Sequence, residues 1–344
     1  MAGPGVAARR AALDALTAVD ERDAYSNLAV PVAVADLADA RDRALASHLA
    51  YDTLRWEGTL DWALAHVIDR DLADVEPVLR RVLRLGALQL LRTDVPPRAA
   101  VSTAVALARG AVPGRRARGA AGFVNGVLRA LARRVSDLPW PAEADDPVGH
   151  LVLTTAHPAW IVTELRDRLG GEARAALEGD NRPPGLTLRA TADRAALLAE
   201  LHAEGIDATP GQLAPEAVHA PGADPRRLAA VTAGRALPQD EASMLVAHAT
   251  RVRSGDRVLD MCAGPGGKST HLAALVGPTG EVTAVELHPH RARLIEDTAA
   301  RVGVPVQVVV GDATDPPVSD GYDAVLVDAP CTGLGTGRCR PEVR

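Results

Sequence analysis

Residues 257–275 read RVLDMCAGPGGKSTHLAAL, and this stretch decides the fold of the C-terminal part of the chain. An apolar run ends at Asp260, a glycine-rich turn follows, and a helical pattern extends from Lys268 to Leu275. A buried strand that passes through a glycine turn into a helix is typical of sheets in which strands and helices alternate. Ligands of such sheets bind beyond the carboxyl ends of the strands, so the turn is a predicted ligand site.

The spacing of the glycines excludes two phosphate-binding loops. A P-loop requires glycine at the position of Cys262, and a dinucleotide pattern that starts at Gly264 requires glycine at the position of Ser269. Glu286 follows Gly264 by 22 residues and ends the next apolar run, where a carboxylate can accept hydrogen bonds from both ribose hydroxyls. An adenosine ligand without a phosphate motif favours S-adenosylmethionine over a nucleotide.

Acidic residues follow the later predicted strands as well. We expect strands at 257–261, 281–287, 306–310 and 322–327, and helices at 239–252, 268–275 and 289–301. Apolar strands joined by helices predict a parallel sheet with helices on both faces. Asp312 and Asp328 come after the third and fourth strands. Asp312 is expected to hold the adenine amino group, and Asp328 the methionine end of the ligand or the target base.

Cys331, in the segment DAPC, indicates the reaction class. Carbon 5 of a pyrimidine is barely nucleophilic until sulfur adds at carbon 6, so methylation there needs covalent catalysis by a thiol. Amine methylation in this fold typically uses an acid-Pro-Pro-aromatic segment instead. The alternative for Cys331 is a small buried hydrophobic residue. Cys262 lies in the ligand turn, and the arginine-rich surroundings of Cys339 point to no such role.

The N-terminal part of the chain has a helical pattern and an uneven charge. Apolar residues recur at three- and four-residue spacing over 6–19, 44–54, 77–91, 99–108 and 123–131, which predicts an all-α domain. The net charge of the chain is −6, yet residues 78–134 hold 12 Arg against the single acid Asp94. This block is either a site for RNA phosphates or a solvated helix face. The predicted RNA contacts are Arg115, Arg116 and Arg118, expected in a glycine-rich turn, and Arg129 in the following helix.

The middle of the chain is a smaller module behind a linker. Residues 135–156 are rich in Pro and Asp and predict a linker. A helix is expected at 157–170, a strand at 181–190 and a helix at 195–201, which together indicate an α+β module. The predicted domains are therefore 1–138 (helical), 150–235 (α+β) and 236–344 (α/β).

Composition narrows the class of protein further. The chain of 344 residues is 47% hydrophobic and 24% charged, which fits a globular protein of two or three domains and excludes a disordered one. Three cysteines are too few for a disulfide framework. The N-terminus lacks the apolar core of a signal peptide, and no stretch approaches the roughly 18 apolar residues of a membrane span. We expect a soluble, cytoplasmic monomer.

Several segments in combination resemble the RNA cytosine-C5 methyltransferases: CAGPGGKSTHLA, AVELHP, GDAT and DAPCTGLGTGR. The helical part, with FVNGVLR, resembles a NusB-type RNA-binding domain, and HPAWIVTEL, NRPPGLTLR and LPQDEAS are similar to the connecting module of NusB-fused rRNA methyltransferases of the RsmB/Sun type. The resemblance implies a Rossmann-like class I methyltransferase domain, S-adenosylmethionine as cofactor and a cytidine of 16S rRNA as target. The cofactor residues that it implies are Cys262, Ala263, Gly264, Pro265, Gly266, Gly267, Lys268, Glu286, Asp312 and Asp328.

The same resemblance assigns a role to Cys331 and exposes a departure. In this family the cysteine of the DAPC segment assists product release, whereas the thiol that attacks carbon 6 lies in a later Thr-Cys-Ser segment. The sequence ends at Arg344, before any such segment, and the strand at 322–327 would form an exposed apolar edge. We therefore expect the chain to be incomplete at its C-terminus and inactive in methyl transfer as it stands.

The sequence thus predicts methylation of carbon 5 of a cytidine in 16S rRNA, on a base that has left its stack. The chemistry implies no metal and no membrane. Two alternatives stay open: an RNA-binding protein with a degenerate, non-catalytic methyltransferase part, and a methyltransferase that acts on tRNA.

Overall fold

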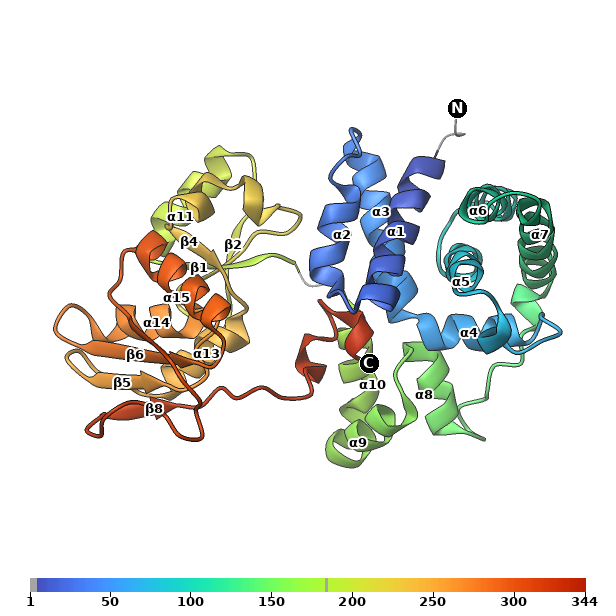
Figure 1. Cartoon of the computed structure of the whole chain (residues 1–344). Helices are drawn as coiled ribbons and strands as arrows, with labels where there is room; N and C mark the ends of the chain where they lie inside the picture. Colours follow the sequence, from blue (N-terminus) through green and yellow to red (C-terminus); the bar gives the residue numbers. More distant parts are fainter. Residues whose placement is uncertain (1–4, 183–184) are drawn as a thin grey trace. The chain divides into compact units, whose positions relative to one another are not determined.

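The computed structural model describes residues 5–182 and 185–344 (Figure 1). Contacts group the chain into two units: Met1–Pro183 together with Thr332–Arg344, and Pro184–Cys331. The double proline within the predicted strand at 181–190 lies outside the described residues, and the domain boundaries 1–138, 150–235 and 236–344 stay a prediction.

The first unit begins with a helical domain, as the apolar spacing predicts. Its helices are α1 (Val6–Arg22), α2 (Ser26–Val34), α3 (Ala40–Arg55), α4 (Glu57–Ala65), α5 (Pro77–Arg92), α6 (Pro97–Ala111) and α7 (Arg116–Arg134). Pro77 and Pro97 each occupy the first turn of a helix, where a missing N–H costs nothing. Asp39 caps α3 by accepting a hydrogen bond from the amide of Arg41 at 2.6 Å. Apolar side chains from all these helices form one core.

Two predictions about this region are wrong. Arg116 and Arg118 do not lie in a glycine-rich turn, because α7 already begins at Arg116 and continues through the glycines that follow. Residues 135–156 are not only a linker, because they contain α8 (Pro147–Thr155), which Asp146 caps through the amide of Gly149 at 2.8 Å. Leucines of α8 are buried, and a short apolar segment of this kind is missed when periodicity alone is searched.

Helix α8 packs with α9 (Ala159–Leu169) and α10 (Ala173–Asp180) around a small apolar cluster of their own. The segment Thr332–Arg344 belongs to the same unit and contains two short 3₁₀ helices, Leu334–Thr336 and Pro341–Val343. Leu334 packs on the α8–α10 cluster. The carboxylate of Glu342 accepts a hydrogen bond from the amide of Ser26 at 3.0 Å.

The second unit holds two sheets. The first is antiparallel, with strand order β2-β3-β1-β4, and pairs Leu188 with both Val218 and Pro238. Its apolar side chains form a core with those of α11 (Arg194–Ala203) and α12 (Ala229–Thr232). The strands are β1 (Thr187–Ala190), β2 (Thr209–Pro210), β3 (Ala217–His219) and β4 (Ala236–Pro238). The α+β character expected of this region is present.

The second sheet is parallel, with strand order β7-β6-β5-β8. It consists of β5 (Arg257–Asp260), β6 (Glu281–Glu286), β7 (Gln307–Val310) and β8 (Ala324–Leu326). The helices are α13 (Glu241–Ala249), α14 (Gly267–Val276) and α15 (Pro289–Val302). Because the strands are parallel and in sequence order 3-2-1-4, the residues that follow all four strands gather at one edge of the sheet.

The described helices cover this sheet on one face, not on both as predicted. Helix α14 packs against both α13 and α15, so the three helices form one row. The connection from β7 to β8, residues 311–323, contains no helix. Strand β8 is an edge strand in which Leu326 is buried, whereas Val325 and the following Val327 are more than half exposed.

Among the described residues, no helix combines the length and the apolar character that a membrane span requires.

Candidate functional site

The glycine-rich turn is built on a buried acid. Asp260 ends β5 with only 1% of its surface exposed, and its Oδ2 accepts a hydrogen bond from the hydroxyl of Ser269 at 2.7 Å. Its Oδ1 is buried without a hydrogen bond of full geometry, although the backbone amide of Cys262 lies close to the carboxylate and favours its ionised form. Burial raises the pKa of Asp260 to about 6, although the Ser269 hydroxyl acts in the opposite direction. A buried acceptor of this kind fits a ligand that donates a proton or carries positive charge.

Two glycines of the turn are required by close approach. Gly264 lies over Glu286, and a Cβ at this position would collide with the Glu286 carboxylate. Gly266 has a φ of 101°, and a Cβ there would stand 3.0 Å from the Cα of Ile295 in α15. Since both the backbone angle and the packing exclude a side chain at Gly266, helix α14 can begin directly after the turn.

Glu286 ends β6 underneath the turn and is 5% exposed. Its Oε2 accepts a hydrogen bond from the amide of Gly264 at 3.1 Å, and its Oε1 accepts one from the amide of His288 at 3.0 Å. Arg291 bridges to the same turn, because its guanidinium lies 3.6 Å from Oε2 and donates to the carbonyl of Gly264 at 2.7 Å. Each carboxylate oxygen keeps a second lone pair that a ligand hydroxyl can use.

Lys268 and Asp328 join the turn to the end of β8. The Nζ atom of Lys268 lies 2.6 Å from Oδ2 of Asp328, and both side chains line a cavity of about 280 Å³ beside the turn. Asp260 lines the same cavity, where the charge of Lys268, the lone lysine of the chain, lowers the pKa of Asp260 and that of Asp328 raises it. Predicted cofactor residues in the lining are Cys262, Ala263, Gly264, Pro265, Gly267, Lys268 and Asp328.

The remaining predicted residues lie at the same sheet edge but do not line the cavity. Gly266 and Glu286 are underneath the turn. Asp312 is exposed after β7, and its carboxylate accepts hydrogen bonds from the amide and hydroxyl of Thr314, which lower its pKa. Cys331 is exposed after β8. Burial raises the pKa of the Cys262 thiol, and the neighbouring carboxylates raise it further, so Cys262 is poorly suited to act as a thiolate.

Sequence reasoning missed the other wall of the cavity. Pro238, Gln239, Asp240 and Ser243 line it from the end of β4 and the start of α13. Arg189 of β1 is buried and holds this wall in place, because its Nε donates to Gln239 at 2.8 Å and its Nη2 donates to Thr270 of α14 at 2.8 Å. The segment LPQDEAS, which contains Gln239 and Asp240, could have indicated this wall, but it contributed only to the family resemblance, which assigned no role to its residues.

A cluster of Glu216, His248 and His271 connects α14 to neighbouring elements of the second unit. Oε1 of Glu216 lies 2.5 Å from Nε2 of His271 and 2.9 Å from Nε2 of His248. Burial lowers the pKa of His271 to about 4, and Arg189 also lowers it, so this imidazole is neutral at pH 7. The side chain of Glu216 therefore ties the antiparallel sheet to α13 and α14 within the same unit.

The basic block of the helical domain is less uniform than its charge count implies. Arg81 is buried and paired with Asp20 and Glu21 at 2.8 and 2.7 Å. Arg84 is buried and paired with Glu57 and Asp61 at 2.9 and 2.6 Å. These arginines stabilise the helical core. Eight others are exposed and form no ion pair with an acid within the described residues: Arg92, Arg98, Arg109, Arg115, Arg118, Arg129, Arg133 and Arg134. Of these, Arg92 lies over the ring of Trp56 and Arg134 donates to the carbonyl of His66.

The structure separates the four predicted RNA contacts. Arg116 pairs with Glu76 at 2.5 Å, so its charge is partly compensated. Arg115 and Arg118 lie beside it at the start of α7, whereas Arg129 lies 13 residues further along the helix, which is about 20 Å away. These residues cannot all contact one phosphate group.

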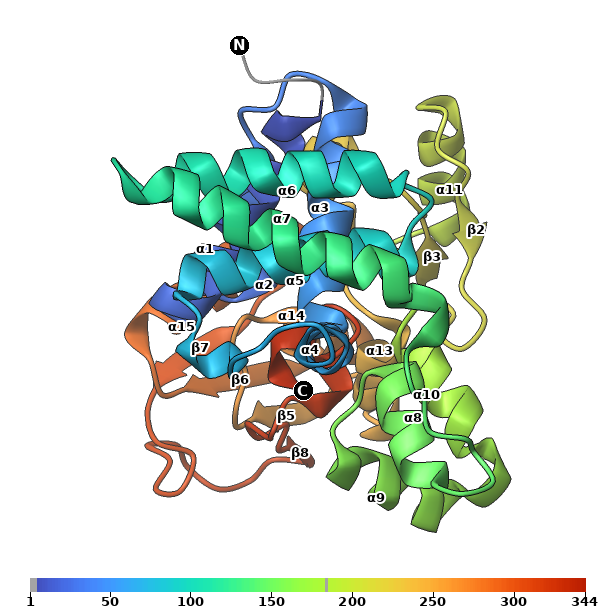
Figure 2. The ribbon, with the colours of Figure 1, turned by 90° about the vertical axis from the view of Figure 1, so that its right-hand side faces the viewer.

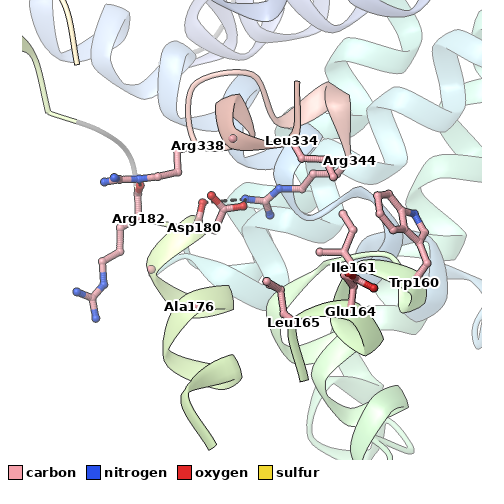
Figure 3. A pocket seen from close by; sticks show the side chains of 12 residues that line it. Trp160, Ile161, Glu164, Leu165, Ala176, Asp180, Arg182, Leu334, Arg338 and Arg344 are labelled. Atoms are coloured by element: carbon pink, nitrogen blue, oxygen red, sulfur yellow. Dashed lines mark hydrogen bonds and ion pairs between the residues drawn. The ribbon is translucent and has the colours of Figure 1, made fainter. Parts of the chain in front are cut away.

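A further hollow in the first unit, of about 610 Å³, lies between α9, α10 and the segment that follows Thr332 (Figure 3). Arg344 projects into it and donates to Asp180 at 3.2 Å, while Ile161, Leu165 and Leu334 form an apolar wall. Burial lowers the pKa of Arg344 to about 10. Because Arg344 is buried and paired with Asp180, we interpret this hollow as part of the packing of segment 332–344 against α10 and not as a ligand site.

A parallel sheet with an acid-glycine turn after its first strand, and further acids after the neighbouring strands, defines a methyltransferase of the Rossmann-like class. Comparisons with known proteins specify the group. Family models match residues 6–133 (NusB family), 157–223 (RsmF/B-like methyltransferase, ferredoxin-like domain) and 247–344 (16S rRNA methyltransferase RsmB/F). The chain belongs to the RsmB/F family of 16S rRNA methyltransferases, with a NusB-like helical domain, a ferredoxin-like module and a methyltransferase domain.

Individual relatives agree with this assignment. A putative methyltransferase of Mycobacterium tuberculosis is 44% identical over 351 residues, which cover 98% of this chain and 75% of that protein. The probable ribosomal RNA small subunit methyltransferase B of Bacillus subtilis is 37% identical over 347 residues, which cover 98% of this chain and 76% of that protein. The crystal structure of PH0851 superposes with a TM-score of 0.80 over 100% of this chain and 78% of its own, at 22% identity, which shows a shared fold.

Proposed function

We propose that this protein transfers a methyl group from S-adenosylmethionine to carbon 5 of a cytidine in 16S rRNA. The observation that carries the proposal is the cavity beside the glycine turn, which is lined by the buried carboxylate of Asp260 and by the ion pair of Lys268 with Asp328. The family membership and the name of the Bacillus subtilis relative, a probable ribosomal RNA small subunit methyltransferase B, support the substrate class.

The cavity fits S-adenosylmethionine by the chemistry of its lining. Asp260 offers a buried acceptor to the ammonium group at the methionine end of the cofactor. Glu286 is not part of the lining, but it lies directly beneath the turn and has lone pairs for ribose hydroxyls. The glycines keep the turn open, and α14 begins at Gly267 next to the cavity. Bound S-adenosylmethionine supplies an electrophilic methyl group on a sulfonium centre.

The cysteine chemistry rests on the resemblance. A thiolate adds to carbon 6 of the cytosine and makes carbon 5 nucleophilic; after methyl transfer, carbon 5 loses its proton and the sulfur leaves carbon 6. We assign Cys331, exposed after β8, to the release step. The attacking thiol belongs to the Thr-Cys-Ser segment named above, which the printed sequence does not contain.

Two measurements test the proposal. Deletion of the encoding gene is expected to remove one 5-methylcytidine from 16S rRNA, read by bisulfite sequencing, and restoration of the gene is expected to return it. An unchanged 16S rRNA would contradict the proposal. A modification lost from tRNA instead would favour the tRNA alternative, and no lost modification at all would favour a non-catalytic RNA-binding protein.

The cofactor site is tested on the chain itself. Glu286→Gln keeps the shape of the side chain but removes its charge and replaces one acceptor by an NH2 group that faces the amide of Gly264 or of His288. Both the hydrogen bonds to a ribose and the support of the turn are weakened, so the affinity for S-adenosylmethionine should fall by about tenfold to a hundredfold. The matched control is Glu281→Gln at the other end of β6, where the side chain is exposed and paired with Arg257. Titration calorimetry should detect no change in the control. Equal affinities of Glu286→Gln and the parent would remove Glu286 from the site.

A further inference from the structure

A groove runs along the open end of the α6–α7 hairpin in the helical domain. Figure 2 shows the two helices lying side by side, and the groove between them has a volume of about 690 Å³. The first half of α6 and the second half of α7 form its walls, so it lies at the opposite end of the hairpin from Arg115 and Arg118. Its lining consists of Pro97, Arg98, Val101, Ser102, Val105, Asn125, Arg129, Ala132 and Arg133.

The groove collects uncompensated positive charge. Arg98, Arg129 and Arg133 are exposed, and no carboxylate lines the groove. None of these three arginines has an acidic partner within the described residues, in contrast to Arg81 and Arg84 in the core. Three guanidinium groups therefore face one hollow with no counter-charge, which is a strong attraction for a polyanion.

The spacing and the uncharged lining favour a nucleic-acid strand over a compact anion. Arg129 and Arg133 are one helical turn apart, so their Cβ atoms are separated by about 5–6 Å, comparable with successive phosphates along a strand. Val101 and Val105 give the groove an apolar floor. Guanidinium groups pair with phosphates and also stack on unpaired bases, and an amide such as that of Asn125 can read base edges.

We propose that this groove binds a single-stranded segment of the RNA substrate, with Arg98, Arg129 and Arg133 on the phosphates and Asn125 and Ser102 available to bases or to 2′-hydroxyl groups. The identity of the polyanion as RNA rests on the proposed function. The groove, and not the start of α7, is then the principal RNA anchor of the helical domain.

The test compares two triple variants. Arg98→Ala, Arg129→Ala and Arg133→Ala together remove the charge of the groove. Arg109→Ala, Arg115→Ala and Arg118→Ala together form the comparison variant, which removes the same charge from the other end of the hairpin and includes two RNA contacts predicted from the sequence. These arginines are also exposed and also lack acidic partners within the described residues. Binding of in vitro transcribed 16S rRNA is measured by filter retention over a series of KCl concentrations. Circular dichroism confirms that both variants keep their helices.

The groove variant should lose about two units of the slope of log K against log salt, since each phosphate contact on a single strand contributes about 0.7. Its affinity at 0.1 M KCl should fall by tenfold or more, while the comparison variant loses much less. Equal losses in the two variants, or a larger loss in the comparison variant, would overturn the proposal. Displacement of the RNA by poly-glutamate at equivalent charge would overturn the choice of RNA as occupant.

The outcome is separable from that of the proposed function. If gene deletion leaves the modifications of 16S rRNA unchanged but the groove variant still loses RNA binding, the methylation proposal fails and the groove stands. If deletion removes a 5-methylcytidine but the groove variant binds RNA normally, the groove proposal fails alone.

Discussion

Replacement of Gly266 by alanine should destabilise the second unit, because both the backbone angle of Gly266 and its packing against Ile295 disfavour a side chain. Its φ of 101° lies in the left-handed region, which costs a non-glycine residue about 1–2 kcal/mol. An added Cβ would also stand 3.0 Å from the Cα and 3.3 Å from the Cγ2 of Ile295, and relief of such overpacking costs about 1–3 kcal/mol. Together these contributions give an expected loss of unfolding free energy of about 2–5 kcal/mol.

Gly303→Ala isolates the backbone contribution. Gly303 ends α15 with a φ of 78°, but an added Cβ would meet nothing within 4 Å. Its substitution should therefore cost about 1–2 kcal/mol from backbone strain alone. The difference between the two variants measures the packing of the turn against α15.

The assay has to observe the second unit separately. All four tryptophans, Trp56, Trp62, Trp140 and Trp160, belong to the first unit, so tryptophan fluorescence does not follow the unfolding of the second. Hydrogen exchange of the β5 and β6 amides, read by mass spectrometry, reports the free energy of opening this sheet. Equal losses in Gly266→Ala and Gly303→Ala would refute the argument that Ile295 restricts the turn.

Three further predictions follow from the same structure. Burial lowers the pKa of His271 to about 4, against 6.5 in the unfolded chain, so the unfolded state binds more protons between these pH values. The free energy of unfolding should therefore fall by up to about 3 kcal/mol as the pH drops from 6.5 to 4. Asp260, whose pKa is raised to about 6, acts in the opposite sense over the same window, so the contribution of His271 is read as the difference between the exchange-derived pH profiles of the parent and His271→Gln. Lys268→Met should raise the pKa of Asp260 above 6, because the charge of Lys268 favours the ionised form of Asp260, whereas that of Asp328 opposes it. Carbon-13 NMR of the carboxyl groups detects the shift, and an unchanged titration of Asp260 would contradict its interaction with Lys268. Asp61→Ala should lower the unfolding free energy of the first unit by about 2–3 kcal/mol, because it leaves the buried Arg84 paired with Glu57 alone. Glu76→Ala, which breaks the exposed pair with Arg116, should lower it by under about 1 kcal/mol. Tryptophan-monitored denaturation compares the two variants, and equal losses would refute the distinction between buried and exposed ion pairs.

The sequence was most informative where local chemistry leaves one solution. The turn after Asp260 needs glycine at positions where a side chain would meet Glu286 or Ile295, and the apolar runs around it are too short for anything but buried strands. The predicted parallel pairing is present, and the family resemblance is confirmed by the matching family models. The apolar spacing also predicted the helical character of the first 134 residues.

Other features depend on residues that are distant in sequence. Whether an arginine is a core ion pair or a free surface charge depends on which acids the helices bring near it, so the block 78–134 could not be divided by counting. The wall formed by Gln239 depends on Arg189, which lies 50 residues earlier in another sheet. One face of the parallel sheet has no described helix on it because residues 311–323 form none, and the sequence of this segment shows neither the helical nor the strand spacing of apolar residues.

The sequence by itself determined the class of fold, the position of the ligand turn and the family, because each rests on short-range spacing that backbone geometry enforces. Only the tertiary structure decided which charges remain available. Burial fixes the pKa of Asp260 and His271, and packing assigns Arg84 to the core and Arg129 to an open groove. The physical reason is that desolvation and ion pairing depend on distances between elements, and a linear pattern does not contain those distances.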